Sequence, residues 1–435
     1  MTGTLERRTH PAWLGRVLIA IGLSAGVTAG AFSNTPSDLV MDWNDIAREF
    51  IVVQALTPVE QTRAMAIVHV AVHDAVTAVT PRYESYTPVG TPPAGASLDA
   101  IVISAAHTAL AGIVGTSDSL TGKYTASLEV HGVSPVDPGL AFGRAVAEGV
   151  LALRDPAVDG SGSARFSYTA PDAGEPGVWT PTSALPADQA LLPGWGAVTP
   201  WVLRSPSQFR PDPPPALDSE PYARDYNEVR QIGAFSSPLR TDEQTQIALF
   251  WRASPTALWN PVLRQAIREH GLTIEETARV MALFYMASSD ASVACWEAKY
   301  HYNFWRPQAA IVNGGVDGND ATIAEPGWAP RVPTAPHPEF PSGHTSNSGA
   351  MAAVLKGFFG DDPGFVIEAT STQAPGFIRR WATFSEGVDE VIDARVYSGI
   401  HFRTADEAGA RLGRQVAQFT LTHALRPVRG PRDLP

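Results

Sequence analysis

Eighteen consecutive residues, Thr62–Val79, contain only two formal charges and are otherwise mostly apolar. A helix with so few polar positions has to be covered on several sides, so the fold must place other helices around it. Apolar residues recur at helical spacing in the ranges 98–114, 139–153, 241–251, 275–305, 346–357 and 405–425. No alternation typical of paired strands and no repeat is visible. The pattern predicts an all-α fold, a helical bundle made of two packed four-helix-type bundles.

A proline-rich stretch interrupts the helical pattern. Twelve of the 37 prolines lie between Pro171 and Pro221, and such a stretch cannot be a helix. The tryptophans at positions 179, 195 and 201 indicate that it packs over the helices. We therefore predict that residues 171–222 form an irregular segment wrapped around a single all-α domain, 32–435.

The composition excludes several classes of protein. With 44% hydrophobic and 17% charged residues, the 435-residue chain has ample material for a core. Its 44 acidic residues outnumber 32 Lys and Arg, and the net charge of −12 argues against a nucleic-acid partner. The single cysteine, Cys295, excludes an intrachain disulfide and a thiolate metal cluster.

Residues 1–31 are predicted to be a secretory signal peptide. Three arginines precede an apolar, glycine-broken stretch that contains the small-residue run 29–31. An uncleaved anchor is the alternative, but the stretch is shorter than the roughly 20 residues that a spanning helix needs. No later segment approaches that length, so we expect a secreted protein, periplasmic or extracellular, without an integral membrane domain.

The run 299–307 combines two cations with aromatic side chains. Seven residues are about two helical turns, so on one helix ended by Pro307, Lys299 and Arg306 would point the same way. Two adjacent cations on an apolar helix repel each other unless an anion lies between them. The alternative is a pair of solvent-facing charges, which the aromatic surroundings disfavour.

The run 338–344, Pro-Glu-Phe-Pro-Ser-Gly-His, predicts the start of a helix. Free backbone N–H groups and the positive end of the dipole make such a start a binding site for anions. Ser342 can add a hydroxyl donor, and His344 adds a group that titrates near neutral pH. A plain capping motif would explain Ser342 but not His344.

The third candidate pair is Arg395 and His401. Six residues on a helix are about 240° apart, so the two side chains converge only if the chain turns, which Gly399 permits. Together the three runs supply a lysine, two arginines, a hydroxyl, an amide and two imidazoles. That set suits a compact tetrahedral or trigonal-bipyramidal oxyanion such as phosphate or vanadate.

The order of these runs, K-x6-R-P, then P-S-G-H, then R-x5-H, resembles the vanadium-dependent haloperoxidases. The same order occurs in the related type-2 phosphatidic acid phosphatases and class A acid phosphatases. The similarity to secreted bacterial haloperoxidases covers most of the chain after residue 31, including 42–44, 69–74 and 250–251. It implies vanadate as cofactor within residues 290–425, and oxidation of halide by hydrogen peroxide to hypohalous acid, with a small organic acceptor.

The resemblance also implies roles for individual residues. His401 matches the histidine that binds vanadium axially, or is phosphorylated in the phosphatases. His344 matches the acid–base histidine, and Lys299 the group that polarises peroxide. The residues that match the groups holding vanadate oxygens are Lys299, Arg306, Ser342, Gly343 and Arg395.

Two further positions bear on the halide. His337 stands where fungal chloroperoxidases have Phe and algal bromoperoxidases have His, which favours bromide or iodide. Trp296, one turn before Lys299, is expected to form a wall of the halide site, with a core position as the alternative.

The chain also departs from its relatives at two places. Ala394 replaces the usual serine, and Ala405 stands where many relatives have an acidic residue, with Asp406 one position later. The partner that orients His401 is therefore left open.

Other polar residues carry weaker hypotheses. His69 and His73, with Asp74 adjacent, have the spacing of a helical metal pair, but their apolar neighbours favour packing and a buried hydrogen bond. Asp290 could pair with a cation of the site or cap a partner helix. We expect Cys295 to be a small buried residue and not a nucleophile.

Two alternatives to a haloperoxidase stay open. In a soluble acid phosphatase, His401 would attack a phosphate ester while His344 protonates the leaving group. A non-catalytic phosphate or vanadate binder would not need both histidines. The sequence does not determine the oligomeric state.

Overall fold

The computed structural model describes residues 36–54, 56–181 and 190–428. The predicted signal peptide, residues 1–31, therefore lies outside the described residues. Within the described ranges, no helix has both the length and the apolar character needed to cross a membrane.

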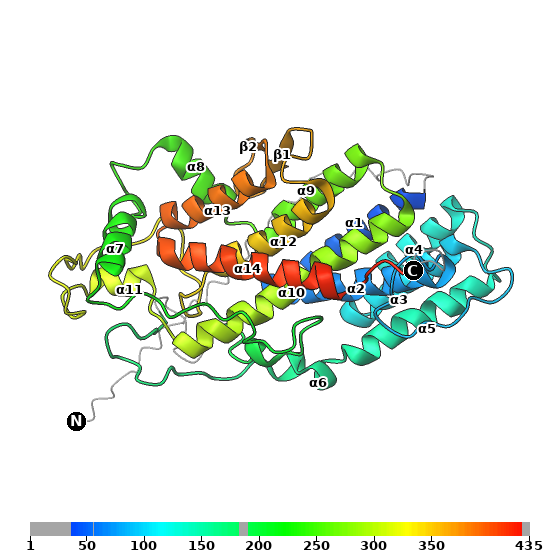
Figure 1. Ribbon diagram of the computed structural model, residues 1–435, viewed down its shortest axis with the longest axis horizontal. Coiled ribbons are helices and arrows are strands. Elements are labelled where there is room, and N and C mark those ends of the chain that lie inside the picture. The colour runs from blue at the N-terminus through cyan, green and yellow to red at the C-terminus, as the bar shows by residue number, and fades with distance from the viewer. Residues whose placement is uncertain (1–35, 55, 182–189, 429–435) are drawn as a thin grey trace, which may run out of the picture.

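Helix α10 (Ile274–Tyr302) is the longest element and runs through the middle of the molecule (Figure 1). Its residues 280–296 are all buried. The helices that pack against it include α1 (Pro36–Val53), α2 (Pro58–Val79), α12 (Gly343–Phe359) and α14 (Arg403–His423). Two groups of helices, one N-terminal and one C-terminal, thus share α10 as a common wall.

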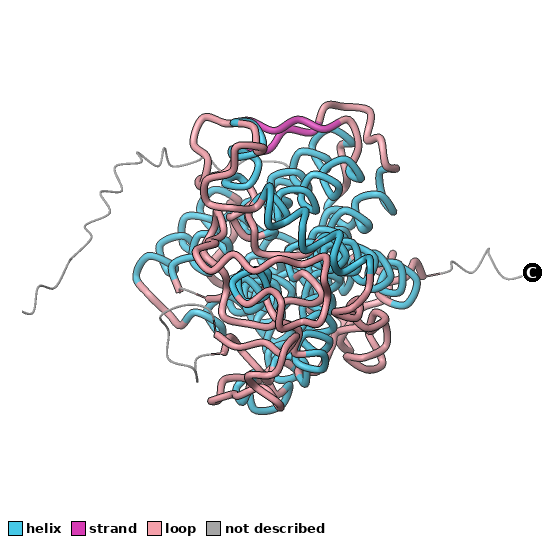
Figure 2. The backbone as a smooth tube through the Cα atoms, turned by 90° about the vertical axis from the view of Figure 1, so that its left-hand side faces the viewer, coloured by secondary structure: helices cyan, strands magenta, loops and turns pink. Residues whose placement is uncertain are grey.

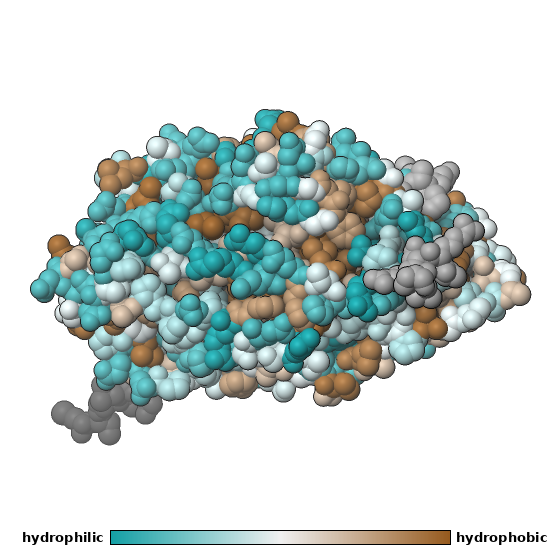
Figure 3. All heavy atoms as spheres, in the orientation of Figure 1, coloured by the Kyte–Doolittle hydropathy of each residue, from teal (hydrophilic) through white to brown (hydrophobic). Residues whose placement is uncertain are grey.

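The other elements complete these two groups or connect them. They are α3 (Leu98–Val114), α4 (Asp118–Val130), α5 (Pro138–Leu153), α6 (Pro156–Asp159), α7 (Glu220–Ile232), α8 (Asp242–Phe250), α9 (Pro255–His270), α11 (Pro307–Val312), α13 (Phe384–Tyr397), the 3-10 turns η1 (Ser161–Ser163) and η2 (Trp195–Ala197), and the strands β1 (Ile367–Thr370) and β2 (Ile378–Trp381). The predicted all-α fold is confirmed. Hydrophilic side chains cover most of the face in Figure 3, as expected for helices that bury one side.

The apolar helices lie close to their predicted ranges. The almost uncharged run 62–79 belongs to α2, which starts four residues earlier because Thr57 and Glu60 form a capping box. The pattern did not identify α1, α4, α7, α9 and α13. Helix α7 shows why, since five of its 13 residues are charged and only one face is buried.

The prediction that Lys299 and Arg306 share one helix is wrong. Helix α10 ends at Tyr302 because Asn303 adopts a left-handed conformation, with φ of 48°. Arg306 is the N-cap of α11, so Pro307 begins a helix and does not end one. The two cations reach the same site from different elements.

The proline-rich segment is irregular in its described part, although it contains η2 and gives way to α7 at Glu220. Its tryptophans are buried against the helices, as predicted. Asp290 accepts hydrogen bonds from the backbone N–H groups of residues 201–203, and so fastens this segment to α10. The hypothesis that Asp290 pairs with a cation of the site is therefore wrong. Figure 2 shows loops gathered at one end of the molecule.

One short antiparallel hairpin, β1–β2, was not predicted. Trp381 of β2 is buried, and its ring stacks on Trp259 with centroids 6.3 Å apart. Each strand has four residues, too few for an alternating pattern to be recognised.

Glycines allow α12 and α14 to pack closely. A Cβ atom on Gly413 would overlap with the carbonyl oxygen of Ser346, and one on Gly349 would approach that of Ala410 to 2.6 Å. Because each added Cβ atom would meet backbone atoms of the facing helix, the overlap cannot be relieved by rotation of a side chain.

We predict that Gly413→Ala lowers the free energy of unfolding by about 2 kcal/mol, as overpacking does in well-packed cores. The matched control is Gly122→Ala on α4, where a Cβ meets nothing within 4 Å. This change should raise stability by up to about 1 kcal/mol. Urea unfolding of both variants measures the difference, and equal midpoints would contradict the close packing of α12 and α14.

Candidate active site

A cavity of about 150 Å³ lies among the ends of several helices. Seven of the nine residues predicted for the site line it: Trp296, Arg306, His337, Gly343, His344, Arg395 and His401. The other two lie behind this lining. Ser342 precedes Gly343 in the chain, and the Cε atom of Lys299 is 3.9 Å from the position of a Cβ on Gly343. The structure therefore brings all three predicted runs to one place.

Arg306 is buried at the centre of the site. Its Nε donates to the carbonyl oxygen of His337 at 2.9 Å, and its Nη1 donates to that of Ile400 at 2.9 Å. Nη1 also lies 3.1 Å from Nε2 of His401. Main-chain oxygens thus fix the guanidinium beside the imidazole without neutralising it.

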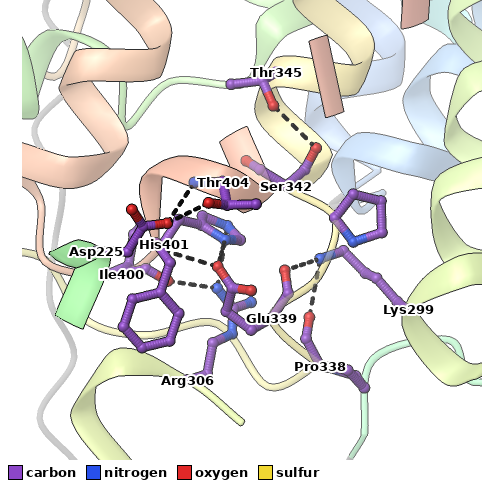
Figure 4. A network of polar contacts seen from close by, with 12 residues as sticks. Asp225, Lys299, Arg306, Pro338, Glu339, Ser342, Thr345, Ile400, His401 and Thr404 are labelled. Atoms are coloured by element: carbon purple, nitrogen blue, oxygen red, sulfur yellow. Dashed lines mark hydrogen bonds and ion pairs between the residues drawn. The ribbon is translucent and has the colours of Figure 1, made fainter. Parts of the chain in front are cut away.

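Lys299 is fully buried and points at two carbonyl groups (Figure 4). Its Nζ donates to the oxygens of Pro338 at 2.9 Å and Glu339 at 2.8 Å. Burial lowers the pKa of Lys299 to about 7. The ammonium therefore gains or loses its proton near neutral pH, according to whether an anion is present.

Glu339 is the orienting partner of His401, which sequence reasoning left open. Its Oε1 accepts from Nδ1 of His401 at 2.9 Å and from the backbone N–H of Phe402 at 3.0 Å (Figure 4). With a proton on Nδ1, Nε2 of His401 carries the lone pair and accepts a hydrogen bond from Nη1 of Arg306 at 3.1 Å. Asp406, the other acidic candidate, does not contact His401 through any hydrogen bond of the described residues.

The segment 337–344 ends at the start of α12, as predicted. Ser342 is the N-cap of this helix, but its side chain makes no cap bond. Its Oγ is buried near the carboxyl group of Asp406, which it helps to stabilise, but it has no hydrogen bond of normal geometry within the described residues. A side chain at Gly343 would approach Trp296 to 3.2 Å, so glycine keeps the backbone next to the aromatic wall.

Arg395 and His344 are both held by the backbone of the loop between α8 and α9, a role that was not predicted although Trp251 belongs to the family resemblance. Nη1 of Arg395 donates to the carbonyl oxygen of Trp251 at 2.8 Å. The ring of His344 hydrogen-bonds to the backbone of Ala253. Gly399, with φ of 76°, makes the predicted turn between Arg395 and His401. Main-chain carbonyls have no residue signature, so this role of the loop could not be found from the sequence.

Burial controls the charge of the imidazoles. It lowers the pKa of His337, His344 and His401 well below the usual range, and nearby arginines add to the effect. All three rings are therefore neutral near pH 7. Burial also lowers the pKa of Arg306 and of Arg395 to about 10, and both remain charged.

The acidic groups are also shifted by burial. Burial raises the pKa of Glu339 to about 7, against the opposing effect of Arg306 and Lys299. It raises the pKa of Asp406 well above the usual range. The carboxyl groups thus offset the cationic charge only in part, and the site as a whole favours an anion.

Unpartnered polar atoms show that an oxyanion fits this site. Nε of Arg395, Oγ of Ser342 and Nε2 of His344 are all buried without a hydrogen bond of normal geometry in the described part of the chain. Two of these groups donate hydrogen bonds, and the neutral imidazole can donate or accept. Buried polar atoms of this kind normally have partners, so the donor set fits vanadate or phosphate.

The predicted walls of the cavity are in place. The ring of His337 lies 5.0 Å from that of Trp296, and its Nδ1 lies 2.9 Å from Nη2 of Arg306. Trp296 donates its indole N–H to the carbonyl oxygen of Leu191 at 3.1 Å. Trp296 therefore combines a wall position with the core position that was the alternative.

The remaining candidates have structural positions. His69 stacks on Tyr285, and His73 lies 3.1 Å from the carbonyl oxygen of Glu84. Nε2 of His69 also lies 2.8 Å from Nδ2 of Asn44, so the contacts of both histidines agree with packing and buried hydrogen bonds. Cys295 is buried, and burial raises the pKa of its thiol.

Comparisons with known proteins agree with this geometry. Residues 279–430 match the family model of the VCPO second helical-bundle domain. Vanadium chloroperoxidase from Curvularia inaequalis is 24% identical over 208 residues, which are 40% of this chain and 34% of that protein. The match thus spans about a third of the length of the curated relative.

Solved structures resemble the chain over a longer range. The first bacterial vanadium-dependent iodoperoxidase is 27% identical, with a TM-score of 0.77 over 91% of this chain and 99% of that one. The resemblance to the vanadium-dependent haloperoxidases is confirmed. An apo-type bacterial vanadium-dependent chloroperoxidase shares the haloperoxidase fold, with 18% identity and a TM-score of 0.68 over 84% of this chain and 94% of that one.

We predict that anion binding at this haloperoxidase-like site weakens as the pH rises through about 7. Lys299 loses a proton and Glu339 becomes charged in this range, so both changes reduce the positive charge. Sulfate keeps its charge there, and calorimetric titration with sulfate at several pH values therefore reports the protein groups. Each linked proton contributes up to about tenfold in affinity per pH unit.

The variant Lys299→Met tests this assignment. It should bind sulfate more weakly and with a shallower dependence on pH, because one of the two titrating groups is gone. A slope identical to that of the wild type would contradict the role of Lys299.

Proposed function

We propose that the protein is a vanadate-dependent haloperoxidase that oxidises halide with hydrogen peroxide to hypohalous acid. The observation that carries the proposal is the convergence of Lys299, Arg306, Arg395 and two neutral histidines on one cavity. The similarity to a bacterial vanadium-dependent iodoperoxidase, 27% identical over 91% of this chain, supports the same class of reaction.

Different residues of the site would hold the oxygens and the metal of vanadate. Lys299, Arg306, Ser342, Gly343 and Arg395 would hold its oxygens, and Nε2 of His401 would bind the vanadium. When bound, vanadate would act as a Lewis acid that activates peroxide for attack by halide.

Two residues of the chain serve proton transfer and hydrogen bonding. His344 is neutral, and its unpartnered Nε2 can take and return a proton at the cavity. Lys299 can donate a hydrogen bond to bound peroxide once an anion keeps it protonated. Glu339 accepts a hydrogen bond from Nδ1 of His401 and so keeps Nε2 unprotonated.

We also propose that bromide or iodide is preferred. His337 and Trp296 supply the wall of the cavity, and burial keeps His337 neutral, so it adds no charge that would favour the small, strongly hydrated chloride. A small organic molecule would be the final acceptor of the halogen.

A phosphatase is the second candidate, because the same geometry keeps Nε2 of His401 unprotonated at the cavity, beside Nη1 of Arg306 at 3.1 Å. That nitrogen could attack a phosphate ester, with His344 protonating the leaving group.

The test is a dye bromination assay on the full chain reconstituted with vanadate, with peroxide and bromide supplied. In parallel, the vanadate-free protein is given a chromogenic phosphate ester. We expect bromination without ester hydrolysis. Ester hydrolysis without bromination would make the protein a phosphatase, and activity in neither assay would make it an anion binder.

We predict that His344→Ala lowers the bromination rate by about 10²-fold or more, the usual loss of a general acid–base group. The matched control is His301→Ala, since His301 is exposed and lies outside the cavity. Its rate should equal that of the wild type. A His344→Ala enzyme as active as this control would remove His344 from the reaction.

We further propose that residues 1–31 are removed during export. The intact mass of the protein recovered outside the cytoplasm tests this, and a mass that includes residues 1–31 would contradict it.

A further inference from the structure

We propose that Thr256, together with the first turns of α2 and α9, forms a halide subsite in the wall of the active-site cavity. The inference deepens the proposed haloperoxidase function and rests on it for the meaning of the bound halide. The location itself depends only on the structure, and it can be tested without turnover.

Three helices begin at this one cavity. The lining includes Val59 from the first turn of α2, Thr256 from the first turn of α9, and Gly343 from the start of α12. The first N–H groups of a helix have no intrahelical acceptor, and the positive end of the dipole favours anions there. The third start, α12, belongs to the oxyanion site, which leaves those of α2 and α9 unassigned.

The caps of α2 and α9 leave comparable amides free. Side chains of Thr57 and Ser254 accept from the third N–H group of their helices, and proline occupies the first position in both. The second position is Val59 in α2 and Thr256 in α9, and both residues line the cavity. Two helix starts thus each contribute their second residue to the wall of one small volume.

The side chain of Thr256 is the independent observation that points to a ligand. The residue is 5% exposed, and its Oγ1 has no hydrogen-bond partner within the described residues. A buried hydroxyl without a partner is unfavourable. Thr256 stands three residues after Ala253, whose backbone holds His344. The hydroxyl of Thr256 therefore lies on the same wall as the predicted acid–base group.

The chemistry of this wall suits a large, weakly hydrated monoanion. Pro58, Val59 and Pro255 are apolar, and α2 and α9 contribute no cationic side chain to the lining. Glu60, the acidic residue of the first turn of α2, pairs with Arg165 at 2.7 Å and does not line the cavity. One hydroxyl, helix N–H groups and apolar contacts are enough for bromide or iodide, whereas a multiply charged oxyanion needs the side-chain cations of the neighbouring site.

The direct test is crystallographic. Crystals of the protein with vanadate or phosphate in the oxyanion site are soaked in sodium bromide, and the anomalous signal of bromine locates the ion. We expect a peak beside Thr256 Oγ1 and the first turns of α2 and α9. A peak elsewhere in the cavity, or none, would overturn the inference.

The kinetic test compares two substitutions. Thr256→Val removes the hydroxyl at nearly constant shape, and we expect the KM for bromide to rise about tenfold, as for a lost hydrogen bond to a charged group. The KM for peroxide and the affinity for vanadate should not change. Thr256→Ser keeps the hydroxyl and should retain the KM of the wild type.

Thr277→Val is the matched control. Thr277 is also fully buried with an unpartnered Oγ1, but it lies on α10 and outside the cavity. Its KM for bromide should equal that of the wild type. Equal KM values in Thr256→Val and Thr277→Val would contradict the subsite. Absence of bromination in the wild type would instead reject the proposed function, and the position of the anomalous peak would still decide the inference.

Discussion

The site depends on hydrogen bonds from buried cations to main-chain carbonyl oxygens. Arg306 donates to His337 and Ile400, and Lys299 and Arg395 likewise use backbone acceptors. A carbonyl group fixes the direction of a cation but carries no formal charge to neutralise it. Buried charges that lack a counter-charge are unfavourable. Binding of an anion at this site would therefore stabilise the arrangement of the cations.

The segment 337–344 links the anion site to the rest of the fold. Carbonyl oxygens of residues 337–339 hold the cations, the side chain of Glu339 holds His401, and the segment ends at the start of α12. Two further backbone bonds place the segment itself. Glu339 donates to the carbonyl oxygen of Phe304, and Ser342 donates to that of Ala405. A displacement of the segment would therefore move the acceptors of Lys299, one acceptor of Arg306 and the orienting carboxylate together.

The sequence predicted those parts of the structure that leave a periodic or chemical signal. Helices α2 and α12 follow from their apolar runs, and the three motif runs converge as expected. The prediction that Arg306 lies on the same helix as Lys299 failed because one left-handed residue, Asn303, ends α10 before the arginine. Glu339 was missed as a partner because it adjoins the motif without any spacing rule relating it to His401, 62 residues later. Such contacts depend on tertiary geometry, which short-range patterns do not contain.

One wall of the cavity obtains its positive potential from side-chain cations, and the other obtains it from the starts of α2 and α9. This difference allows the two walls to bind anions of different charge. Arginine side chains and a buried lysine provide full charges with many donors, which suit an ion whose several oxygens each need a partner. The starts of α2 and α9 provide partial charges and one free hydroxyl among apolar groups. An oxyanion placed on the second wall would leave most of its oxygens unsatisfied, while a halide on the first would leave donors unused. Because each misplacement costs hydrogen bonds, the same small cavity can hold both ions in a defined arrangement.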